Sequence, residues 1–356
     1  VNTLIKPQEM NSLLALLERL VALRADALII QDLGLAGLIK TAYPQICVHA
    51  STQMSVHNAP GARVLQQLGI SRVVLARECS LDAMCEVAQT GIQTEVFVHG
   101  AMCVSVSGQC LFSSQIGGRS GNRGKCAQPC RLQYQYKDHA GGLLSMHDLN
   151  TLEALPQLLA AGASSFKIEG RLKRAEYVYI VTDIYRRALD RAANNLPAAD
   201  LQADQRALEQ IFSRGFTAGH AMGQQDAALI GDQHVSHLGV YLGRVTAVQP
   251  RAGFVLAKVR LDMPLGNGDG LQLRGRAEQE CIYSGPPVNA GREATLRLRQ
   301  APAVHDTVWK LQDETQLLRA RQAAEALPRL AFDAELSLAP GQASQLTVSR
   351  GVVNAQ

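Results

Sequence analysis

The sequence predicts an α/β protein, with a (β/α) barrel that lacks its first strands followed by a small antiparallel β-barrel domain. Short apolar segments rich in β-branched residues alternate with amphipathic segments over the first two-thirds of the chain. From about His237 the pattern changes to alternating strands separated by glycine-rich turns. The chain has 356 residues and is 47% apolar, which is enough for a sizeable core and more than one domain.

The first unit is predicted from five strands and the helices between them. Strands are expected at residues 27–30, 46–50, 72–76, 95–100 and 165–170, and helices at 10–23, 59–68, 81–89, 151–160 and 175–193. This alternation indicates βαβ units and a parallel sheet. Its repetition favours a barrel over an open sheet, although periodicity alone does not decide between them. A full barrel needs eight strands, so we expect the opening strands to be missing from this sequence.

The second unit is predicted from five strands of alternating polarity. They lie at residues 239–248, 254–263, 269–275, 293–299 and 306–312. Alternation with short turns is typical of a small antiparallel barrel. The domain boundaries that follow are 1–220, 221–327 and 328–356, and the last segment begins another β pattern that we expect to be truncated.

Composition excludes some classes of protein and leaves others open. The formal net charge of +4 allows an acidic partner such as RNA without requiring one. No run of about 18 apolar residues is present, so no membrane span is predicted. There is no signal peptide, and eight cysteines without one indicate a reducing compartment, with the cytoplasm as the expected location.

Four of the cysteines cluster within 28 residues with the spacing C-x6-C-x15-C-x3-C. They are Cys103, Cys110, Cys126 and Cys130. Cys103 follows a predicted strand directly, and in a (β/α) barrel that end of the strands forms the active site. A structural zinc site more often shows short C-x2-C pairs. Four thiolates with one short pair also suit an iron–sulfur cluster, and unligated or disulfide-bonded cysteines are the third alternative.

Basic residues accompany the cysteines. Arg119, Arg123 and Lys125 lie in the glycine-rich segment between Cys110 and Cys126, and Arg131 follows Cys130. They can hold phosphates or a small anion. Alternatively, they only offset the negative charge of four thiolates.

Polar side chains also follow the predicted strands. The residues that we select as candidates are His49 and Gln53 after the second strand, and Lys167, Glu169 and Arg171 on or after the fifth. Any one of them can be a structural hydrogen-bonding group. Together they favour a shared site, because burying many charges without paired function costs too much. Strand alternation places Lys167 and Glu169 on one face, where they can bind a polar substrate or transfer a proton.

Five segments resemble, in order, the family named peptidase U32 or collagenase-like protease. They are HASTQMSVHN at 49–58, VVLARE at 73–78, EVFVHGAMCVSVSGQC at 95–110, GRSGNRGKCAQPCR at 118–131 and SFKIEGRLKRAEYV at 165–178. The resemblance covers roughly residues 1–220. It is strongest to the branch that hydroxylates cytidine in 23S rRNA, and the branch that hydroxylates tRNA uridine comes next.

The resemblance implies a TIM-like barrel and a [4Fe-4S] cluster on the four clustered cysteines, with zinc as the less favoured occupant. It also implies hydroxylation at C5 of an RNA pyrimidine and a small anionic cosubstrate of the prephenate type. His49, Lys167, Glu169 and Arg171 would then be catalytic, and Arg119, Arg123, Lys125, Arg131 and Gln53 would bind substrate. Two other hypotheses are a peptidase, as the family name says, and a non-catalytic RNA-binding scaffold with a structural cluster.

Overall fold

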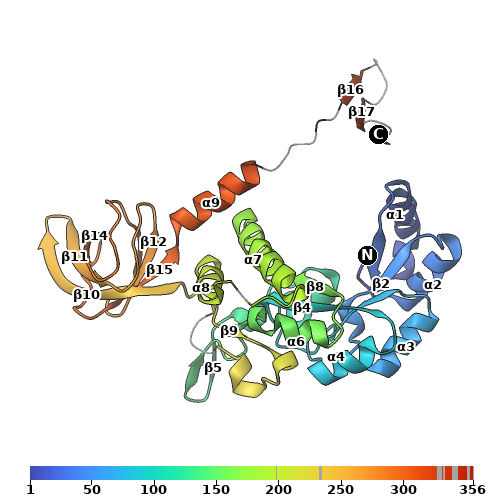
Figure 1. Ribbon diagram of the computed structural model, residues 1–356, viewed down its shortest axis with the longest axis horizontal. Helices are drawn as coiled ribbons and strands as arrows, with labels where there is room; N and C mark the ends of the chain where they lie inside the picture. The colour runs from blue at the N-terminus through green and yellow to red at the C-terminus, as the bar shows by residue number, and fades with distance from the viewer. Residues whose placement is uncertain are drawn as a thin grey trace.

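The computed structural model describes residues 1–197, 199–231, 235–326, 331, 333–338, 344–350 and 353–355. Within these residues the chain forms an α/β body, a six-stranded antiparallel sheet and a three-stranded sheet near the C-terminus (Figure 1). The three-stranded sheet consists of β16 (Asp333–Ser337), β17 (Gln345–Arg350) and β18 (Val353–Ala355). The predicted domain boundaries at 220 and 327 stay predictions.

The α/β body is built on a parallel sheet. β1 (Ala27–Ile30), β2 (Cys47–Ala50), β3 (Arg72–Val74) and β4 (Gln93–Ala101) pair in sequence order and run parallel. β8 (Ser165–Ile168) also pairs with β4 in parallel. These strands confirm the parallel sheet that the alternating pattern predicts, whereas closure into a TIM-like barrel stays a prediction.

β4 is the central strand because its two halves have different partners. Residues 95–99 pair with β8, and residues 99–101 pair in antiparallel orientation with β7 (Asp148–Asn150). β7 pairs in turn with the short strand β9 (Phe216–Thr217). The sequence pattern does not reveal β7 or β9, because strands of three and two residues show no periodicity.

Helices follow the strands and bury one apolar face each. They are α1 (Met10–Ala22), α2 (Leu33–Ala42), α3 (Ala59–Gln67), α4 (Leu81–Ala88), α6 (Leu155–Ala160), α7 (Ala175–Ala193) and α8 (Leu201–Ile211). Side-chain oxygens of Asp32, Asn58 and Ser80 accept N-terminal backbone hydrogen bonds of α2, α3 and α4. Such caps stabilise a helix by about 1 kcal/mol each, and they fix where each helix leaves its strand.

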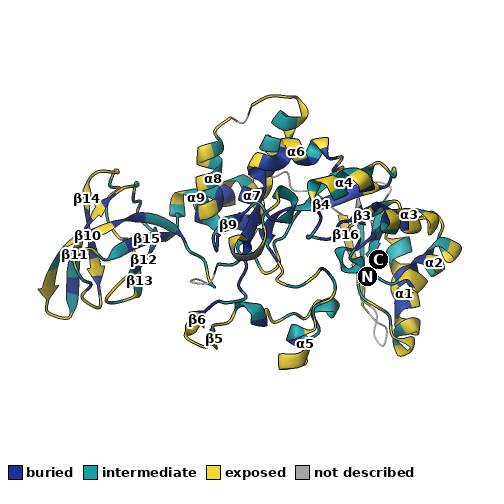
Figure 2. Cartoon of the chain, turned by 90° about the horizontal axis from the view of Figure 1, so that it is seen from below, coloured by how far each residue is buried: buried dark blue, intermediate teal, exposed yellow. Residues whose placement is uncertain are grey.

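The segment between β4 and β7 lies outside this regular pattern. It contains α5 (Phe112–Gly117), the turns η3 (Gly121–Arg123) and η4 (Pro129–Arg131), and the hairpin β5 (Tyr134–Tyr136) and β6 (His139–Gly141). Figure 2 shows α5 and the hairpin on one side of the body, with mostly exposed and intermediate residues. A small cluster of buried apolar side chains, with Met102 and Met146 among its members, lies where this segment begins and ends.

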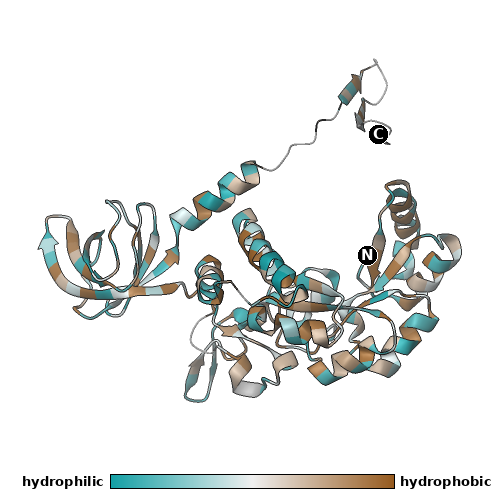
Figure 3. Cartoon of the chain, viewed as in Figure 1, coloured by the Kyte–Doolittle hydropathy of each residue, from teal (hydrophilic) through white to brown (hydrophobic). Residues whose placement is uncertain are grey.

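The second unit is a curled antiparallel sheet with strand order β13-β12-β15-β10-β11-β14. Its strands are β10 (Val240–Arg251), β11 (Phe254–Leu261), β12 (Gly270–Arg274), β13 (Gln279–Ile282), β14 (Glu293–Leu298) and β15 (Thr307–Gln312). Apolar and polar residues alternate along β10 and β11 (Figure 3). This alternation buries one face, which forms its own core around Leu242, Val259 and Leu273. The sequence predicts five of these strands and misses β13.

Buried contacts connect this sheet with the α/β body. The side chain of Gln210 on α8 donates to the carbonyl of Lys310 on β15 at 3.0 Å. Gln316, on α9 (Glu314–Glu325), donates to the carbonyl of Ala207 at 2.9 Å. None of the helices that the structure describes is long and apolar enough to cross a membrane.

Candidate functional site

The four clustered cysteines lie in the segment that follows β4. Cys103 comes two residues after the strand, Cys110 precedes α5, Cys126 follows η3, and Cys130 lies in η4. All four are free thiols; Cys103 is exposed and the other three are half-buried. The end of a strand and three short turns therefore present these thiols.

The loop from Cys103 to Cys110 is held against the ends of β2 and β3. Gly108 has φ +76°, and a Cβ there would lie 2.3 Å from the carbonyl oxygen of Gln53. The hydroxyl of Ser107 accepts a hydrogen bond from the backbone N–H of Arg77 at 3.1 Å, and the backbone N–H of Ser107 donates to Glu78. The loop thus closes over the carboxyl ends of the parallel strands, where the sequence places the site.

The electrostatics show that the four thiols face one region. Burial raises the pKa of Cys130, and the nearby thiols of Cys103, Cys126 and Cys110 raise it further, while Arg131 opposes them. Burial likewise raises the pKa of Cys103, with contributions in the same direction from Cys110 and Cys126. Because these influences act over short distances, segments up to 27 positions apart converge here.

Thiol sulfurs are the ligands of zinc sites and of iron–sulfur clusters, so the donor set fits either group. Among the described residues, no three Cys, His, Asp or Glu side chains are placed to hold a single metal ion. The backbone N–H of Gln128 donates to the sulfur of Cys126 at 3.3 Å, and the backbone at Ser105 donates to that of Cys103. Such N–H···S bonds stabilise thiolate charge.

Two arginines supply positive charge beside the thiols. Arg77 lies over the ring of Phe97, 4.0 Å from its centroid, and its guanidinium is 4.0 Å from the carboxylate of Glu169. Burial lowers the pKa of Arg77, while the nearby Cys103 and Glu169 oppose this shift. Arg131 donates to the carbonyl of Met102 at 2.8 Å and so fixes the backbone next to Cys103.

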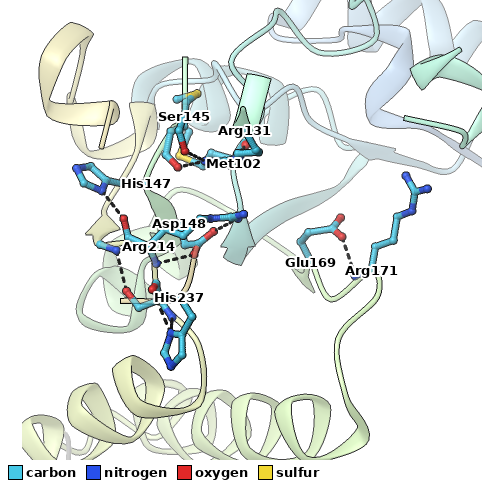
Figure 4. A network of polar contacts seen from close by, with 12 residues as sticks. Met102, Arg131, Ser145, His147, Asp148, Glu169, Arg171, Arg214 and His237 are labelled. Atoms are coloured by element: carbon cyan, nitrogen blue, oxygen red, sulfur yellow. Dashed lines mark hydrogen bonds and ion pairs between the residues drawn. The ribbon is translucent and has the colours of Figure 1, made fainter. Parts of the chain in front are cut away.

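Behind the cysteines lies a buried ionic network that the sequence does not reveal (Figure 4). Asp148 on β7 accepts two hydrogen bonds from Arg214, one from the guanidinium at 2.5 Å and one from the backbone N–H at 3.0 Å. Both side chains are at least nine-tenths buried. Arg131 donates to the hydroxyl of Ser145 at 2.9 Å on the same side of the body. Arg131 and Lys173 lie near enough to Asp148 for its negative charge to raise the pKa of both side chains.

Lys173 is the most perturbed cation of this network. Burial lowers its pKa to about 7, although Asp148 opposes the shift. Its ammonium lies 2.6 Å from the centroid of the Phe212 ring. The side chain lines a cavity of about 630 Å³ between the α/β body and the antiparallel sheet, together with Tyr177 and His237. A lysine whose pKa lies near 7 can gain or lose a proton near neutral pH, which marks this cavity as chemically distinct.

The residues that the sequence selects on the fifth strand separate into two groups. Lys167 forms an ion pair with Glu95 at 2.8 Å, and this pair lies near His49, whose pKa is lowered by burial, by Arg72 and by Lys167. Glu169 instead pairs with Arg77 and so belongs to the thiol region. Lys167 and Glu169 therefore do not form a pair with each other, and each is paired with a different neighbour.

The structure does not bring the side chains of Arg171 and Gln53 together. The backbone N–H of Arg171 donates to Glu169 at 2.9 Å, but its side chain is exposed and extends away from the buried network (Figure 4). The side-chain oxygen of Gln53 is buried and has no hydrogen-bond partner among the described residues. Its backbone supports the Cys103–Cys110 loop.

Of the four basic residues near the cysteines, two are used inside the protein. Arg123 donates to the carbonyl of Leu4 at 3.1 Å and forms an ion pair with Glu9, which ties the loop to the N-terminal segment. Arg131 is held in the contacts described above. Arg119 and Lys125 are exposed, and the only bond that joins them runs from the Arg119 side chain to the Lys125 carbonyl at 3.1 Å.

The model of the family described as "Peptidase family U32" matches residues 1–231 of this chain. The chain belongs to peptidase family U32. The resemblance inferred from the five sequence segments is therefore confirmed.

Curated U32 relatives carry different functional names. The chain is 36% identical over 292 residues to the "23S rRNA 5-hydroxycytidine C2501 synthase" of Escherichia coli K12, covering 77% of this chain and 43% of that protein. It is 37% identical over 235 residues to the "tRNA hydroxylation protein P" of Helicobacter pylori J99, covering 60% and 55%. It is 32% identical over 249 residues to a "Collagenase" of Porphyromonas gingivalis W83, covering 63% and 59%. The chain spans about half the length of these relatives.

The U32 match ends before the antiparallel sheet, so the network of Asp148, Arg214 and Lys173 falls inside it. Reasoning from strand ends misses these residues because Asp148 lies on a strand of three residues and Arg214 precedes one of two. Asp148 stands between His147 and Leu149 in the sequence, so no local pattern marks it as buried.

Proposed function

We propose that this chain is part of an iron–sulfur-dependent enzyme that hydroxylates C5 of an RNA pyrimidine, with cytidine in 23S rRNA favoured and tRNA wobble uridine next. The observation that supports this most is the convergence of four free thiols, two backbone N–H donors and two guanidinium groups over the carboxyl ends of the parallel strands. The names of the rRNA and tRNA relatives support RNA as the substrate.

In this proposal Cys103, Cys110, Cys126 and Cys130 hold a [4Fe-4S] cluster. The cluster would supply redox chemistry, which the ordinary side chains of this region lack. Arg77 and Arg131 offset the charge of the thiolates, and both are held by contacts that keep their guanidiniums in place. The N–H donors at Ser105 and Gln128 orient two of the sulfurs.

Other side chains of the region would bind the base. Glu169 is the carboxylate beside the thiols, where it can accept a hydrogen bond or a proton from the bound base. Arg119 and Lys125 are exposed and can contact RNA phosphates. The excess of cations around Asp148 favours a small anionic cosubstrate, as the resemblance to this family predicts. Lys167 would position Glu95, with which it forms an ion pair, and His49 lies near this pair.

The peptidase hypothesis rests on the family name and on the relative named collagenase. Its nucleophile would be Cys103 with His99 as the base. His99 is 1% exposed, its ring lies 3.3 Å from the hydroxyl of Tyr185, and burial lowers its pKa to about 4. A base so buried and so weak does not activate a thiol on the surface, so we favour the hydroxylase.

The cluster is tested by four single variants, Cys103→Ser, Cys110→Ser, Cys126→Ser and Cys130→Ser, with Cys47→Ser as the matched control. Cys47 is an exposed free thiol on β2, outside the cluster. After anaerobic purification we expect iron and sulfide content to fall at least tenfold in the four variants and to stay unchanged in the control. Equal iron content in all five proteins would exclude the proposed ligands.

The substrate is tested by mass spectrometry of rRNA and tRNA from cells with and without the gene. We expect one pyrimidine to lose a single oxygen atom in mass when the gene is deleted. Restoring the gene should restore the modification, whereas the Cys103→Ser form should not. Two results together would favour the scaffold hypothesis: rRNA and tRNA that are unchanged in the deletion strain, and a purified protein that binds iron.

A further inference from the structure

The outer face of the curled antiparallel sheet is strongly basic. The five neighbouring strands β12, β15, β10, β11 and β14 contain a single acidic residue, Glu293, and the edge strand β13 adds Glu280 opposite Gln272. Side chains on the outer face of these strands include Tyr241, Arg244, Arg260, Arg274, Arg297 and Trp309, which we call the cationic face. Lys258 also lies on this face and is 3.9 Å from Glu293. In the described part of the chain, none of the four arginines of the cationic face forms an ion pair within 4.0 Å.

The strand register places two of these arginines directly opposite each other. Arg244 on β10 pairs with Arg260 on β11, and both side chains are exposed. Like charges at opposed positions of an antiparallel pair destabilise a sheet. Glu293 on β14 lies opposite Arg260, but its carboxylate accepts a hydrogen bond from Thr246 and lies 3.9 Å from Lys258. One carboxylate therefore adjoins three cations, and an anion that binds there reduces the remaining positive charge.

Aromatic rings lie at two places on the cationic face. The guanidinium of Arg274 lies 4.4 Å from the ring centroid of Trp309, and Tyr241 meets Trp309 edge-to-face at 5.7 Å. The side chain of Arg244 donates to the Tyr241 hydroxyl at 3.2 Å, which joins the aromatic cluster to the cationic pair. At the other end of the face, Arg297 lies 4.3 Å from the ring centroid of Phe254.

We propose that the cationic face binds a single strand of RNA. Cations that follow the backbone, interleaved with aromatic rings on which bases stack, are what single-stranded nucleic acids need, and curled antiparallel sheets commonly present them. An acidic protein would use the charges but not the stacked rings. The inference rests on the proposed function for the choice of RNA, and it assigns recognition to a part of the chain beyond residues 1–231, to which the U32 match is confined.

The chain contains one tryptophan, Trp309, so the face carries its own fluorescent probe. We expect a short single-stranded RNA, such as a mixed-sequence oligonucleotide, to quench this fluorescence when it binds. Affinity should fall as salt rises, because counterions are released from the phosphates. The double variant Arg244→Gln with Arg260→Gln should weaken binding at least tenfold and lower the salt slope by about two, one for each cation removed.

The matched control is Arg19→Gln with Arg63→Gln, which removes the same charge from exposed positions on α1 and α3. We expect this control to bind RNA as the unchanged protein does. The Arg244 and Arg260 variant should fold at least as stably, since it relieves a like-charge pair. If both double variants lose affinity equally, or if polyglutamate binds and quenches as well as RNA, the proposal is wrong. Binding is measured without turnover, so a protein that binds RNA but does not hydroxylate it still supports this inference. A protein that hydroxylates RNA normally, while the RNA leaves the fluorescence of Trp309 unchanged, contradicts it.

Discussion

His99 and Cys103 are four positions apart, yet they have opposite environments. His99 lies where the partner of β4 changes from β8 to β7, close to the rings of Tyr177, Tyr185 and Phe216, and is 1% exposed. Cys103 lies beyond the end of the strand and is exposed. Both residue types are common in active sites, and the sequence selects Cys103 because three other cysteines follow it closely. Burial separates them, because it makes His99 a structural group and leaves the thiol accessible.

His99 should make the protein sensitive to acid. Its pKa is about 4 in the folded protein, and the ordinary value is near 6.5, so the unfolded chain takes up a proton that the buried ring does not. The free energy of unfolding should therefore fall as pH drops from 6.5 to 4, by roughly 3 kcal/mol from this residue. Urea unfolding at several pH values measures the slope. His99→Gln should show a smaller slope over this range, and an equal slope would assign the effect to other groups.

The Cys103–Cys110 loop is the element on which the candidate site depends most. Its backbone must pass close to the carbonyl of Gln53, and only a residue without a side chain fits at Gly108. The same loop bonds to Glu78 and to the backbone of Arg77. Contacts with the residues that follow β2 and β3 therefore position the loop and its thiols. The spacing of the cysteines alone does not determine where the thiols lie.

Gly108→Ala should disturb the site more than the fold. An L-residue at φ +76° is strained by about 1 kcal/mol, and the added Cβ must also move away from Gln53. We expect a several-fold loss of bound iron with a small decrease in thermal midpoint. The control is Gly117→Ala in α5, where a Cβ meets nothing within 4 Å and alanine favours the helix. Iron contents that match in the two variants would contradict this role of Gly108.

At the scale of the whole molecule, Lys310 joins the antiparallel sheet to the α/β body. Its ammonium lies 2.8 Å from Asp269 and 3.0 Å from Asp313, the residue that caps α9. Its carbonyl accepts the hydrogen bond from Gln210 on α8. Lys310 is 4% exposed and Asp269 is 1% exposed, so one buried ion pair and one buried hydrogen bond meet at this junction.

Lys310→Met should destabilise the protein by about 3 kcal/mol, because it leaves the Asp269 carboxylate buried without its cation. Adding Asp269→Asn should recover part of that loss. Denaturant unfolding followed by the fluorescence of Trp309, which adjoins Lys310 on β15, measures both variants. If the double variant is less stable than the single one, the loss does not come from an unpaired carboxylate.

Much of the fold follows from periodicity. The pattern of the sequence predicts β1, β2, β3, β4 and β8 and five of the six strands of the curled sheet. Apolar runs in β1–β4 and alternating apolar residues in β10 and β11 indicate which side chains are buried. It misses β7, β9 and β13, whose few residues pair only because neighbouring strands are already in place. Closure of the parallel sheet into a barrel is a prediction that still rests on the sequence.

By itself, the sequence determined the family, the parallel sheet and the four cysteines, since these depend on residue identity, spacing and local periodicity. The tertiary structure decided which charges meet. It paired Glu169 with Arg77 and Lys167 with Glu95, and it brought Asp148, Arg214 and Lys173 together from three distant segments. The physical reason is that ion pairing and burial depend on distances between residues far apart in the chain, which no local pattern encodes.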